Sequence, residues 1–383
     1  MPKILFIAGT NFELYYLSSV AHLLKRKDPS IQCQLLVRDV FEPNIAPELK
    51  NLYTSIQPFK IPTLTFPVSK DPIQTIKNFK KNMEDLSFFR KFIRKVLTNV
   101  DIVCISCFRE FFANVMAKVA PKPVKLVALR LADEKVEDMK WQKKPFLSFI
   151  LNIKNFFFGY SPMDYKWSTE QKWYLVTKNY RKNPYSCTIA ITDNDLGEKK
   201  NLTRILPPFS VLRELFGKGE EKPAILVAGD KTPFYQGWAP QDEENYKKFF
   251  DFLRTQFPNH LLYFKPKPGR TDSSHYDLEG FQILPAESSL EEFCLRKNIE
   301  KLITIRSTSA KVGAYFGIPS YVLYPMFQIP PDFHQYLDNY FDDMKNSIVK
   351  VKNLEDLKKI PNNSISQNSF NNLASLYQEA IIG

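Results

Sequence analysis

Histidine, cysteine and glycine are scarce in this sequence, and the scarcity limits the chemistry that it can carry. The 383 residues include only 4 His, 5 Cys and 12 Gly. The histidines are scattered, and Cys104 and Cys107 form a lone Cys-x-x-Cys motif without a second pair of ligands, so we expect neither a zinc site nor a redox site. An odd cysteine count in a chain of this length favours reduced thiols and a cytoplasmic location.

Long apolar runs are also missing. No segment contains the ~18 consecutive apolar residues that a membrane-spanning helix requires. Residues 1–9 hold a single cation and a short apolar run, which fits a buried first strand better than a secretory signal. Both observations favour a cytoplasmic protein without a transmembrane segment.

Positive charge, in contrast, is plentiful. The chain has 53 Lys and Arg against 41 Asp and Glu, which gives a net charge of +12 at pH 7. Such an excess favours an anionic partner, which could be a phosphate-bearing substrate, a membrane surface or a nucleic acid. Because no RNA-recognition or helix-turn-helix pattern is present, we expect no nucleic-acid partner.

Strand-like and helix-like segments alternate through the first half of the chain. Short apolar runs at residues 3–9, 32–39, 101–107 and 124–133 are separated by stretches with helical apolar spacing. This alternation predicts a parallel sheet with crossover helices, whose ligands bind at the carboxyl ends of the strands. The candidates at those ends are Gly9, Asn11, Asp133 and Glu134.

A second alternating series follows residues 206–223, a stretch rich in Pro, Gly and charge that is typical of a linker. We therefore predict an α/β fold with two doubly wound, Rossmann-like parallel-sheet domains that face each other across a cleft. The predicted domains are residues 1–210 and 220–350. Residues 351–383 are predicted to form a helical tail that could pack back on the N-terminal domain.

The strand ends of the second half concentrate cations and hydroxyl groups. The run YFKPKPGR, residues 263–270, places three cations and two prolines directly after a strand, where proline fixes a rigid turn. Two further strand ends lead into the helix starts PAESS and RSTSA, where hydroxyls and free backbone amides favour anion binding. N-capping is the alternative for Ser307, Thr308 or Ser309, although it explains one hydroxyl better than three, and a solvated turn is the alternative for the lysines. The predicted substrate-binding residues at these strand ends are Lys265, Pro266, Lys267, Arg270, Glu287, Ser288, Ser307, Thr308 and Ser309.

Together, these motifs resemble the C-terminal domain of the bacterial sialyltransferases and polysialyltransferases that build capsules and lipooligosaccharides. In that group, a strand leads into a Lys-Pro-His-Pro-like turn, a Pro and Glu segment follows, and a Ser-Ser/Thr motif opens a helix. Here the order is YFKPKPGR, LPAESSLEEF and LITIRSTSAKVGAYFGIPSYVLYP. The group also carries an acidic pair at a strand end of its N-terminal domain, which Asp133 and Glu134 match.

The resemblance implies a GT-B glycosyltransferase that is inverting and metal-independent and that uses no cofactor. It would transfer sialic acid or a related nonulosonic acid from a CMP-linked donor to a surface glycan or glycolipid. Asp133 or Glu134 would be the general base that deprotonates the acceptor hydroxyl. The residues that would hold the donor phosphate are Lys265, Lys267, Ser307 and Thr308.

Two positions depart from the group. Lys267 stands where the group has the histidine that protonates or stabilises the departing phosphate, and Lys135 replaces the glycine after the acidic pair. A lysine neutralises a phosphate as a point charge, but it is a poor proton donor at neutral pH. The pair Asp133 and Glu134 also fits a solvated charge run. The alternatives are a UDP- or GDP-sugar-dependent transferase or epimerase of the same fold, and a non-catalytic nucleotide- or glycan-binding relative.

Other strand ends could complete such a site. Gly9 allows close backbone approach, and Asn11 or Glu13 could bind an acceptor. Gly229 and Asp230 end the first strand of the second domain, where transferases of this fold often touch the nucleotide. The first domain would therefore bind the acceptor, and the second domain the nucleotide-sugar.

Residues 143–160, KKPFLSFILNIKNFFFGY, combine lysines with a dense apolar face. Such a segment could rest on the inner face of a membrane, aided by the basic charge of the chain, and bring the enzyme to a lipid-linked acceptor. A core helix with snorkelling lysines is the alternative.

Overall fold

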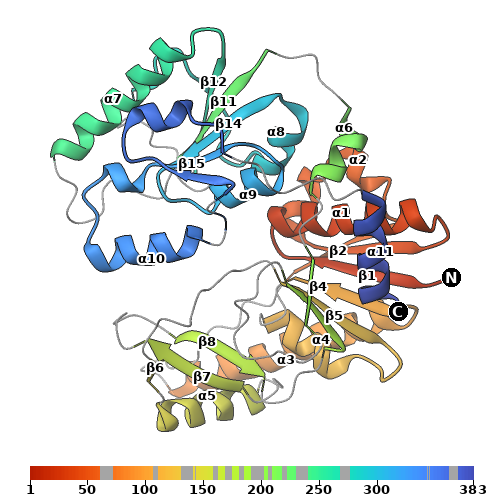
Figure 1. The fold of residues 1–383 in the computed structure, drawn as a ribbon. Helices are drawn as coiled ribbons and strands as arrows, with labels where there is room; N and C mark the ends of the chain where they lie inside the picture. Colours follow the sequence, from red (N-terminus) through yellow and green to blue (C-terminus); the bar gives the residue numbers. More distant parts are fainter. Residues whose placement is uncertain are drawn as a thin grey trace. The chain divides into compact units, whose positions relative to one another are not determined.

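The chain divides into two compact units, which we describe separately (Figure 1). Unit 1 comprises Met1–Leu206 and Asn371–Gly383, and unit 2 comprises Pro207–Phe370. The computed structural model describes residues 1–60, 72–106, 111–130, 141–142, 144–157, 163–168, 175–180, 185–190, 202–205, 209–217, 222–229, 240–267, 277–342, 344, 346–361 and 370–383.

Unit 1 is built on a parallel sheet of seven strands in the order β10-β9-β5-β4-β1-β2-β3. The chain starts in β1, moves outward through β2 and β3, and then returns to the other side of β1 with β4. The strand order therefore reverses between β1 and β4, which makes their carboxyl ends a topological switch point. The strands are β1 (Lys3–Ala8), β2 (Gln32–Arg38), β3 (Ser55–Phe59), β4 (Ile102–Ile105), β5 (Lys125–Arg130), β9 (Cys187–Ala190) and β10 (Leu202–Arg204).

Helices cover this sheet because its strands are apolar on both faces. Five of the six residues of β1 are buried, as expected for a central parallel strand. The last helix, α11, packs against α1 in unit 1. The buried hydroxyls of Tyr377 in α11 and Tyr16 in α1 lie 3.0 Å apart. The helices are α1 (Asn11–Lys27), α2 (Pro47–Lys50), α3 (Pro72–Leu97), α4 (Phe111–Val119) and α11 (Phe370–Ile381), with the short 3₁₀ helix η1 (Asp39–Asn44).

A small antiparallel sheet and one helix are inserted between β5 and β9. The sheet has the order β6-β7-β8, and α5 precedes β7 in the chain. The sequence patterns did not predict these strands. The elements are β6 (Trp141–Gln142), α5 (Pro145–Phe157), β7 (Met163–Ser168) and β8 (Leu175–Tyr180).

Unit 2 repeats the topology of unit 1 with six parallel strands in the order β13-β12-β11-β14-β15-β16. Its first strand, β11, again lies in the interior of the sheet, and the strand order reverses between β11 and β14. The strands are β11 (Ala224–Ala228), β12 (Leu261–Lys265), β13 (Gln282–Ile283), β14 (Ile299–Thr304), β15 (Ser320–Val322) and β16 (Ile348–Lys350). The predicted fold class, α/β with two doubly wound parallel sheets, is confirmed.

The core of unit 2 is rich in aromatic side chains. Phe249 and Phe250 of α7 pack edge to face at 5.1 Å between ring centroids, and Phe250 also contacts Phe264 of β12. The helices are α6 (Arg213–Phe216), α7 (Pro240–Gln256), α8 (Leu290–Arg296), α9 (Ser309–Tyr315) and α10 (Pro331–Asp342), with the 3₁₀ helices η2 (Phe209–Leu212), η3 (Tyr324–Met326) and η4 (Leu354–Lys358).

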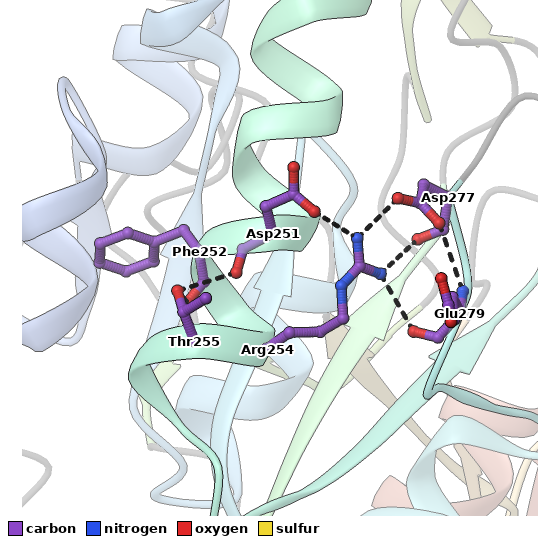
Figure 2. Close-up of polar contacts among 6 residues, drawn as sticks. All are labelled: Asp251, Phe252, Arg254, Thr255, Asp277 and Glu279. Carbon is purple, nitrogen blue, oxygen red and sulfur yellow. Dashed lines mark hydrogen bonds and ion pairs between the residues drawn. The ribbon is translucent and has the colours of Figure 1, made fainter.

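Arg254 at the end of α7 fixes the segment that leads into β13 (Figure 2). Its guanidinium donates to the carboxylates of Asp251 and Asp277, each at 2.6 Å, and to the backbone oxygens of Asp277 and Glu279. The hydrogen bond from Arg254 lowers the pKa of Asp277. Gly280 completes the turn with a φ of 74°, a value that glycine adopts without strain. The clamp therefore sets where β13, and the turn after it, begins.

Candidate functional site

The carboxyl edge of unit 2 consists of the carboxyl ends of β11, β12, β13 and β14 and the turns that follow them. The strands end level with one another, since Ala228 of β11 pairs with Lys265 on one side and with Thr304 on the other. The backbone amide of Gly229 donates to the carbonyl of Lys265 at 2.8 Å. The structure thus brings the predicted Gly229, Lys265 and Ser307 regions to one edge, at the switch point of the sheet.

Lys265 is the anchor of this edge. Its side chain is only 6% exposed, and its ammonium donates to the backbone oxygens of Ala286, at 2.9 Å, and Pro266, at 3.3 Å. Burial lowers the pKa of Lys265, and the nearby carboxylates of Glu291 and Glu287 partly oppose that shift. The ammonium therefore ties the turn after β12 to the turn after β13.

Glu291 lies buried beside this anchor, and sequence reasoning did not select it. The hydroxyl of Ser289 donates to Glu291 Oε2 at 2.8 Å and accepts from the amide of Glu292, so Ser289 is the N-cap of α8. Burial raises the pKa of Glu291, and Lys265 opposes the shift. The run ESSLEE was the available signal, but it fits a capped helix start without any buried charge.

The two other predicted residues of this second turn, Ser288 and Glu287, differ in their availability to a ligand. Ser288 Oγ donates to the carbonyl of Pro285 at 2.7 Å, which closes the turn locally. Glu287 is exposed. Turn closure and N-capping therefore account for the hydroxyls of Ser288 and Ser289.

Lys267 differs from Lys265 although only Pro266 separates them. It is half-buried, and its ammonium makes no hydrogen bond or ion pair with any residue in the described ranges. Pro266, also half-buried, fixes φ in the turn and so limits where Lys267 can reach. Arg270, the third cation of the motif, lies outside the described residues.

The hydroxyls after β14 also divide into engaged and exposed groups. Ser307 Oγ lies 3.0 Å from Ser309 Oγ and accepts from the Ser309 amide at 3.3 Å, while the Ser307 amide donates to Thr304. Thr308 precedes α9, is exposed, and makes no capping hydrogen bond through its side chain. Of the three hydroxyls, that of Thr308 is the one without a partner in the part of the chain that the structure describes.

Two cations missed by sequence reasoning lie close to these hydroxyls in the chain. The guanidinium of Arg306 lies 5.3 Å from the ring centroid of Phe333, and the ammonium of buried Lys311 lies 4.0 Å from that of Tyr340. Both rings belong to α10. Arg306, just before α9, and Lys311, within α9, therefore each lie against an aromatic ring of α10. The available signal was their position in the run IRSTSAK.

Gly229 has a steric reason to be glycine. A Cβ atom there would lie 3.0 Å from Phe264 Cζ and 3.3 Å from the carbonyl oxygen of Lys265. The close approach of β12 therefore disfavours a side chain at this position, whether or not a ligand binds nearby. Asp230, predicted with it, lies outside the described residues.

The corresponding edge of unit 1 is built around a carboxylate. The amide of Gly9 donates to Glu13 Oε2 at 2.5 Å, and Glu13 is only 5% exposed. The Glu13 amide donates in turn to Thr10 Oγ1, so Thr10 is the N-cap of α1 and the half-buried Asn11 is its first residue. After β4, the buried hydroxyl of Ser106 has no hydrogen-bond partner in the described ranges, a feature that the sequence did not signal.

The proposed general bases, Asp133 and Glu134, lie outside the described residues. Among the residues that are described, no group of three His, Cys, Asp or Glu side chains could hold a metal ion. None of the described helices is long and apolar enough to cross a membrane.

Comparisons of sequence identify no relative. No protein-family profile matches the chain, and no curated protein matches it. Solved structures do match. A putative UDP-N-acetylglucosamine 2-epimerase from Listeria monocytogenes is 11% identical, with 97% of this chain and 90% of that chain covered and a TM-score of 0.51. The UDP-GlcNAc 2-epimerase from Neisseria meningitidis bound to UDP-GlcNAc is also 11% identical, with 98% of each chain covered and a TM-score of 0.50. At this identity the likeness shows the fold alone, which is the GT-B fold of two Rossmann-like domains.

Proposed function

We propose that this protein is a nucleotide-sugar-dependent glycosyltransferase, and that its donor is a CMP-linked sialic acid or related nonulosonic acid. The observation that carries the proposal is the ammonium of Lys267, which has no partner among the described residues, at the switch point of unit 2 on a turn that Lys265 holds in place. Ligands of doubly wound sheets bind at such switch points, and a cation there favours a phosphate-bearing one. The order of the KPKPGR, PAESS and RSTSA motifs supports the sialyltransferase assignment.

The proposed reaction is inverting and uses neither a metal nor a cofactor. An acceptor hydroxyl attacks the anomeric carbon, the bond from that carbon to the phosphate oxygen breaks, and CMP leaves with the bonding electrons. Asp133 or Glu134 would take the proton of the hydroxyl. Lys267 would offset the charge that develops on the phosphate, and the exposed hydroxyl of Thr308 would donate to it.

Other predicted residues take supporting roles in this proposal. Lys265 positions the turn rather than the phosphate, because its ammonium already donates to two backbone oxygens. Asn11, at the start of α1, would contact the acceptor, which we propose to be a surface glycan or glycolipid. The amide of Gly9 would not take part, because Glu13 already accepts from it.

A second candidate is a UDP-sugar-dependent enzyme, either a transferase or a 2-epimerase. The specific observation in its favour is that solved structures of UDP-N-acetylglucosamine 2-epimerases match nearly the whole chain at TM-scores of 0.50 and 0.51. This candidate would bind its nucleotide at the same edge of unit 2, but the nucleobase would be uracil instead of cytosine. A protein that binds nucleotide without turnover is the remaining alternative.

Binding and turnover experiments distinguish these candidates. Thermal unfolding with CMP, CDP, UDP or GDP identifies the nucleotide, and incubation with CMP-sialic acid and a glycan acceptor then tests for CMP release. We expect CMP to stabilise the protein more than UDP or GDP does. If UDP or GDP stabilises the protein and CMP does not, the sialyltransferase proposal is excluded. If CMP binds but no acceptor leads to the release of CMP from CMP-sialic acid, the non-catalytic alternative is favoured.

A variant tests the role of Lys267 in nucleotide binding. In Lys267→Ala we expect the affinity for CMP to fall about 10- to 100-fold, the usual loss for a hydrogen bond to a charged group. Lys222→Ala is the matched control, because Lys222 is an exposed lysine of the same unit that precedes β11 at the opposite edge of the sheet. Equal CMP affinity in both variants would remove Lys267 from the site.

A further inference from the structure

Helix α5 of unit 1 carries its apolar side chains on the outside. Six large apolar residues of this 13-residue helix have exposed fractions between 39% and 77%. Several are spaced by three or four positions, so they form a stripe along one side of the helix. The exposed residues are Phe146, Leu147, Phe149, Ile150, Ile153 and Phe156.

The opposite side of α5 is held by polar contacts. Asn152 donates from Nδ2 to the carbonyl of Met163 at 3.0 Å and accepts from the Met163 amide at 2.9 Å. Asn155, which is buried, donates to Asn152 at 3.3 Å. A helix on a water-facing surface normally shows the reverse pattern, with apolar residues inward. The alternative of a core helix therefore does not describe these side chains.

The surroundings of this stripe are basic. Residues 141–157 contain no Asp or Glu, and exposed Lys144 precedes α5 directly. Helix α3 packs on the same core cluster through Leu86 and Phe89, to which Leu151 of α5 also packs. Figure 1 draws α3 and α5 at the same end of unit 1.

The exposed side of α3 repeats this combination of apolar and basic groups. Phe88 is 76% exposed, and Lys91 and Lys95 are exposed at positions three and seven residues beyond it. The helix contains seven Lys and Arg residues against two Asp and Glu. Apolar rings next to an excess of lysines match the chemistry of an anionic lipid surface.

We propose that α5, together with the exposed side of α3, is a docking surface for an anionic lipid bilayer. The helix would lie in the plane of the interface with Phe146, Phe149 and Phe156 inserted among the lipids. Charge favours lipid over a second copy of the chain, because two copies would bring like charges together. The proposal does not rest on the donor or the reaction, since it concerns a surface of unit 1 outside the edge described above.

Vesicle binding by the full chain tests this proposal. We expect sedimentation with vesicles of phosphatidylcholine and phosphatidylglycerol, and much weaker sedimentation with phosphatidylcholine alone or at high salt. In the triple variant Phe146→Gln/Phe149→Gln/Phe156→Gln, we expect binding to the anionic vesicles to fall about 100-fold or more. Ile360→Gln is the control, because Ile360 is 78% exposed but belongs to unit 2.

Charge variants and the oligomeric state complete the test. Lys91→Gln/Lys95→Gln should weaken binding to anionic vesicles while leaving the weak binding to neutral vesicles unchanged. Circular dichroism and thermal unfolding verify that each variant is folded. Undiminished vesicle binding by the triple variant would overturn the proposal. So would a dimer in solution that this variant converts to a monomer, since the stripe would then be an interface between copies.

Discussion

A glycine directly follows the first strand of each of the two large parallel sheets, Gly9 after β1 and Gly229 after β11. The backbone amides of these two glycines have different hydrogen-bond acceptors. In unit 1, the amide of Gly9 donates to the carboxylate of Glu13, whereas in unit 2 the amide of Gly229 donates to the backbone carbonyl of Lys265. Both amides are therefore engaged by the protein. The difference is in charge: the switch point of unit 1 holds the buried acid Glu13, whereas at that of unit 2 the buried acid Glu291 lies beside Lys265 and a second lysine, Lys267, follows on the same turn. A phosphate is consequently expected at unit 2.

The same comparison applies within the turn after β12. Lys265 is buried and donates to two backbone oxygens, and Lys267 is half-buried without a partner among the described residues. One lysine therefore contributes to the structure of the turn, and the other is available to a ligand. Substitutions at this edge, and at the corresponding edge of unit 1, distinguish residues that stabilise the fold from residues that bind a ligand.

Replacing Lys265 should destabilise the protein far more than replacing Lys267. In Lys265→Met, the carbonyl of Ala286 loses its donor and Glu291 stays buried without its nearest cation, so we expect the free energy of unfolding to fall by about 3 kcal/mol. Lys267→Met is the matched control and should change it by less than about 0.5 kcal/mol. Urea unfolding of both variants measures the difference.

A second substitution identifies the source of this loss. The double variant Lys265→Met/Glu291→Leu removes both buried charges, and should therefore recover part of the stability that Lys265→Met loses. If Lys265→Met alone unfolds at the same urea concentration as the control, the anchoring role of Lys265 is wrong.

At the corresponding end of unit 1, the carboxylate of Glu13 should contribute somewhat less. Glu13→Ala leaves the amide of Gly9 without its acceptor at a buried position, so we expect a loss of about 2 kcal/mol in the free energy of unfolding. Glu13→Gln keeps an acceptor oxygen and should lose less than half of that amount. Equal losses in the two variants would indicate that charge, rather than the hydrogen bond to Gly9, determines the contribution.

The alternation of apolar runs was sufficient to predict both sheets, because a buried parallel strand such as β1 or β11 is apolar throughout and is followed by helical spacing. The antiparallel strands β7 and β8 were not predicted. MDYKWS does alternate apolar and polar residues and was the available signal for β7, whereas LVTKNY of β8 lacks a regular alternation. The strand before the KPKPGR motif was predicted, and β12 ends at Lys265, whereas residues 268–270 of the motif lie outside the described residues. The separate roles of Lys265 and Lys267 were not predictable, because the acceptor of Lys265 lies 21 residues away, at Ala286.

The hydroxyls after β14 allow a smaller test of the same separation. Thr308→Val removes the exposed hydroxyl but keeps the shape of the side chain, so CMP affinity should fall about 10-fold, the lower end of the range for a hydrogen bond to a charged group. Stability should not change. Ser307→Ala instead breaks the contacts with Ser309 and should lower stability by about 1 kcal/mol. Calorimetric titration with CMP and urea unfolding separate the two outcomes. A Thr308→Val variant with full affinity would place the phosphate elsewhere on the edge.

The smallest expected effect is a pH dependence from the buried Glu291. Burial raises its pKa in the folded state above the ordinary value of 4.5. Between that value and the raised one, the folded protein binds more protons than the unfolded chain, so the contribution of Glu291 to stability falls as pH rises. The free energy of unfolding of the native protein minus that of Glu291→Gln should therefore decrease with pH in this window, by at most about 1.4 kcal/mol per pH unit.

Asp356 provides a control of opposite sign for this measurement. It is also buried in unit 2, but it accepts hydrogen bonds from Lys359 and from the amides of Lys352 and Asn353, and its pKa is lowered. The contribution of Asp356 is thus present above its ordinary pKa and is lost as pH falls. The same subtraction for Asp356→Asn should increase with pH over the acidic range. If the free-energy difference for Glu291→Gln also increased with pH, as expected for Asp356→Asn, Lys265 would stabilise the carboxylate of Glu291 by more than burial destabilises it. Lys265 would then pair with Glu291 as a strong ion pair, and the contrast with Lys267 would be larger still.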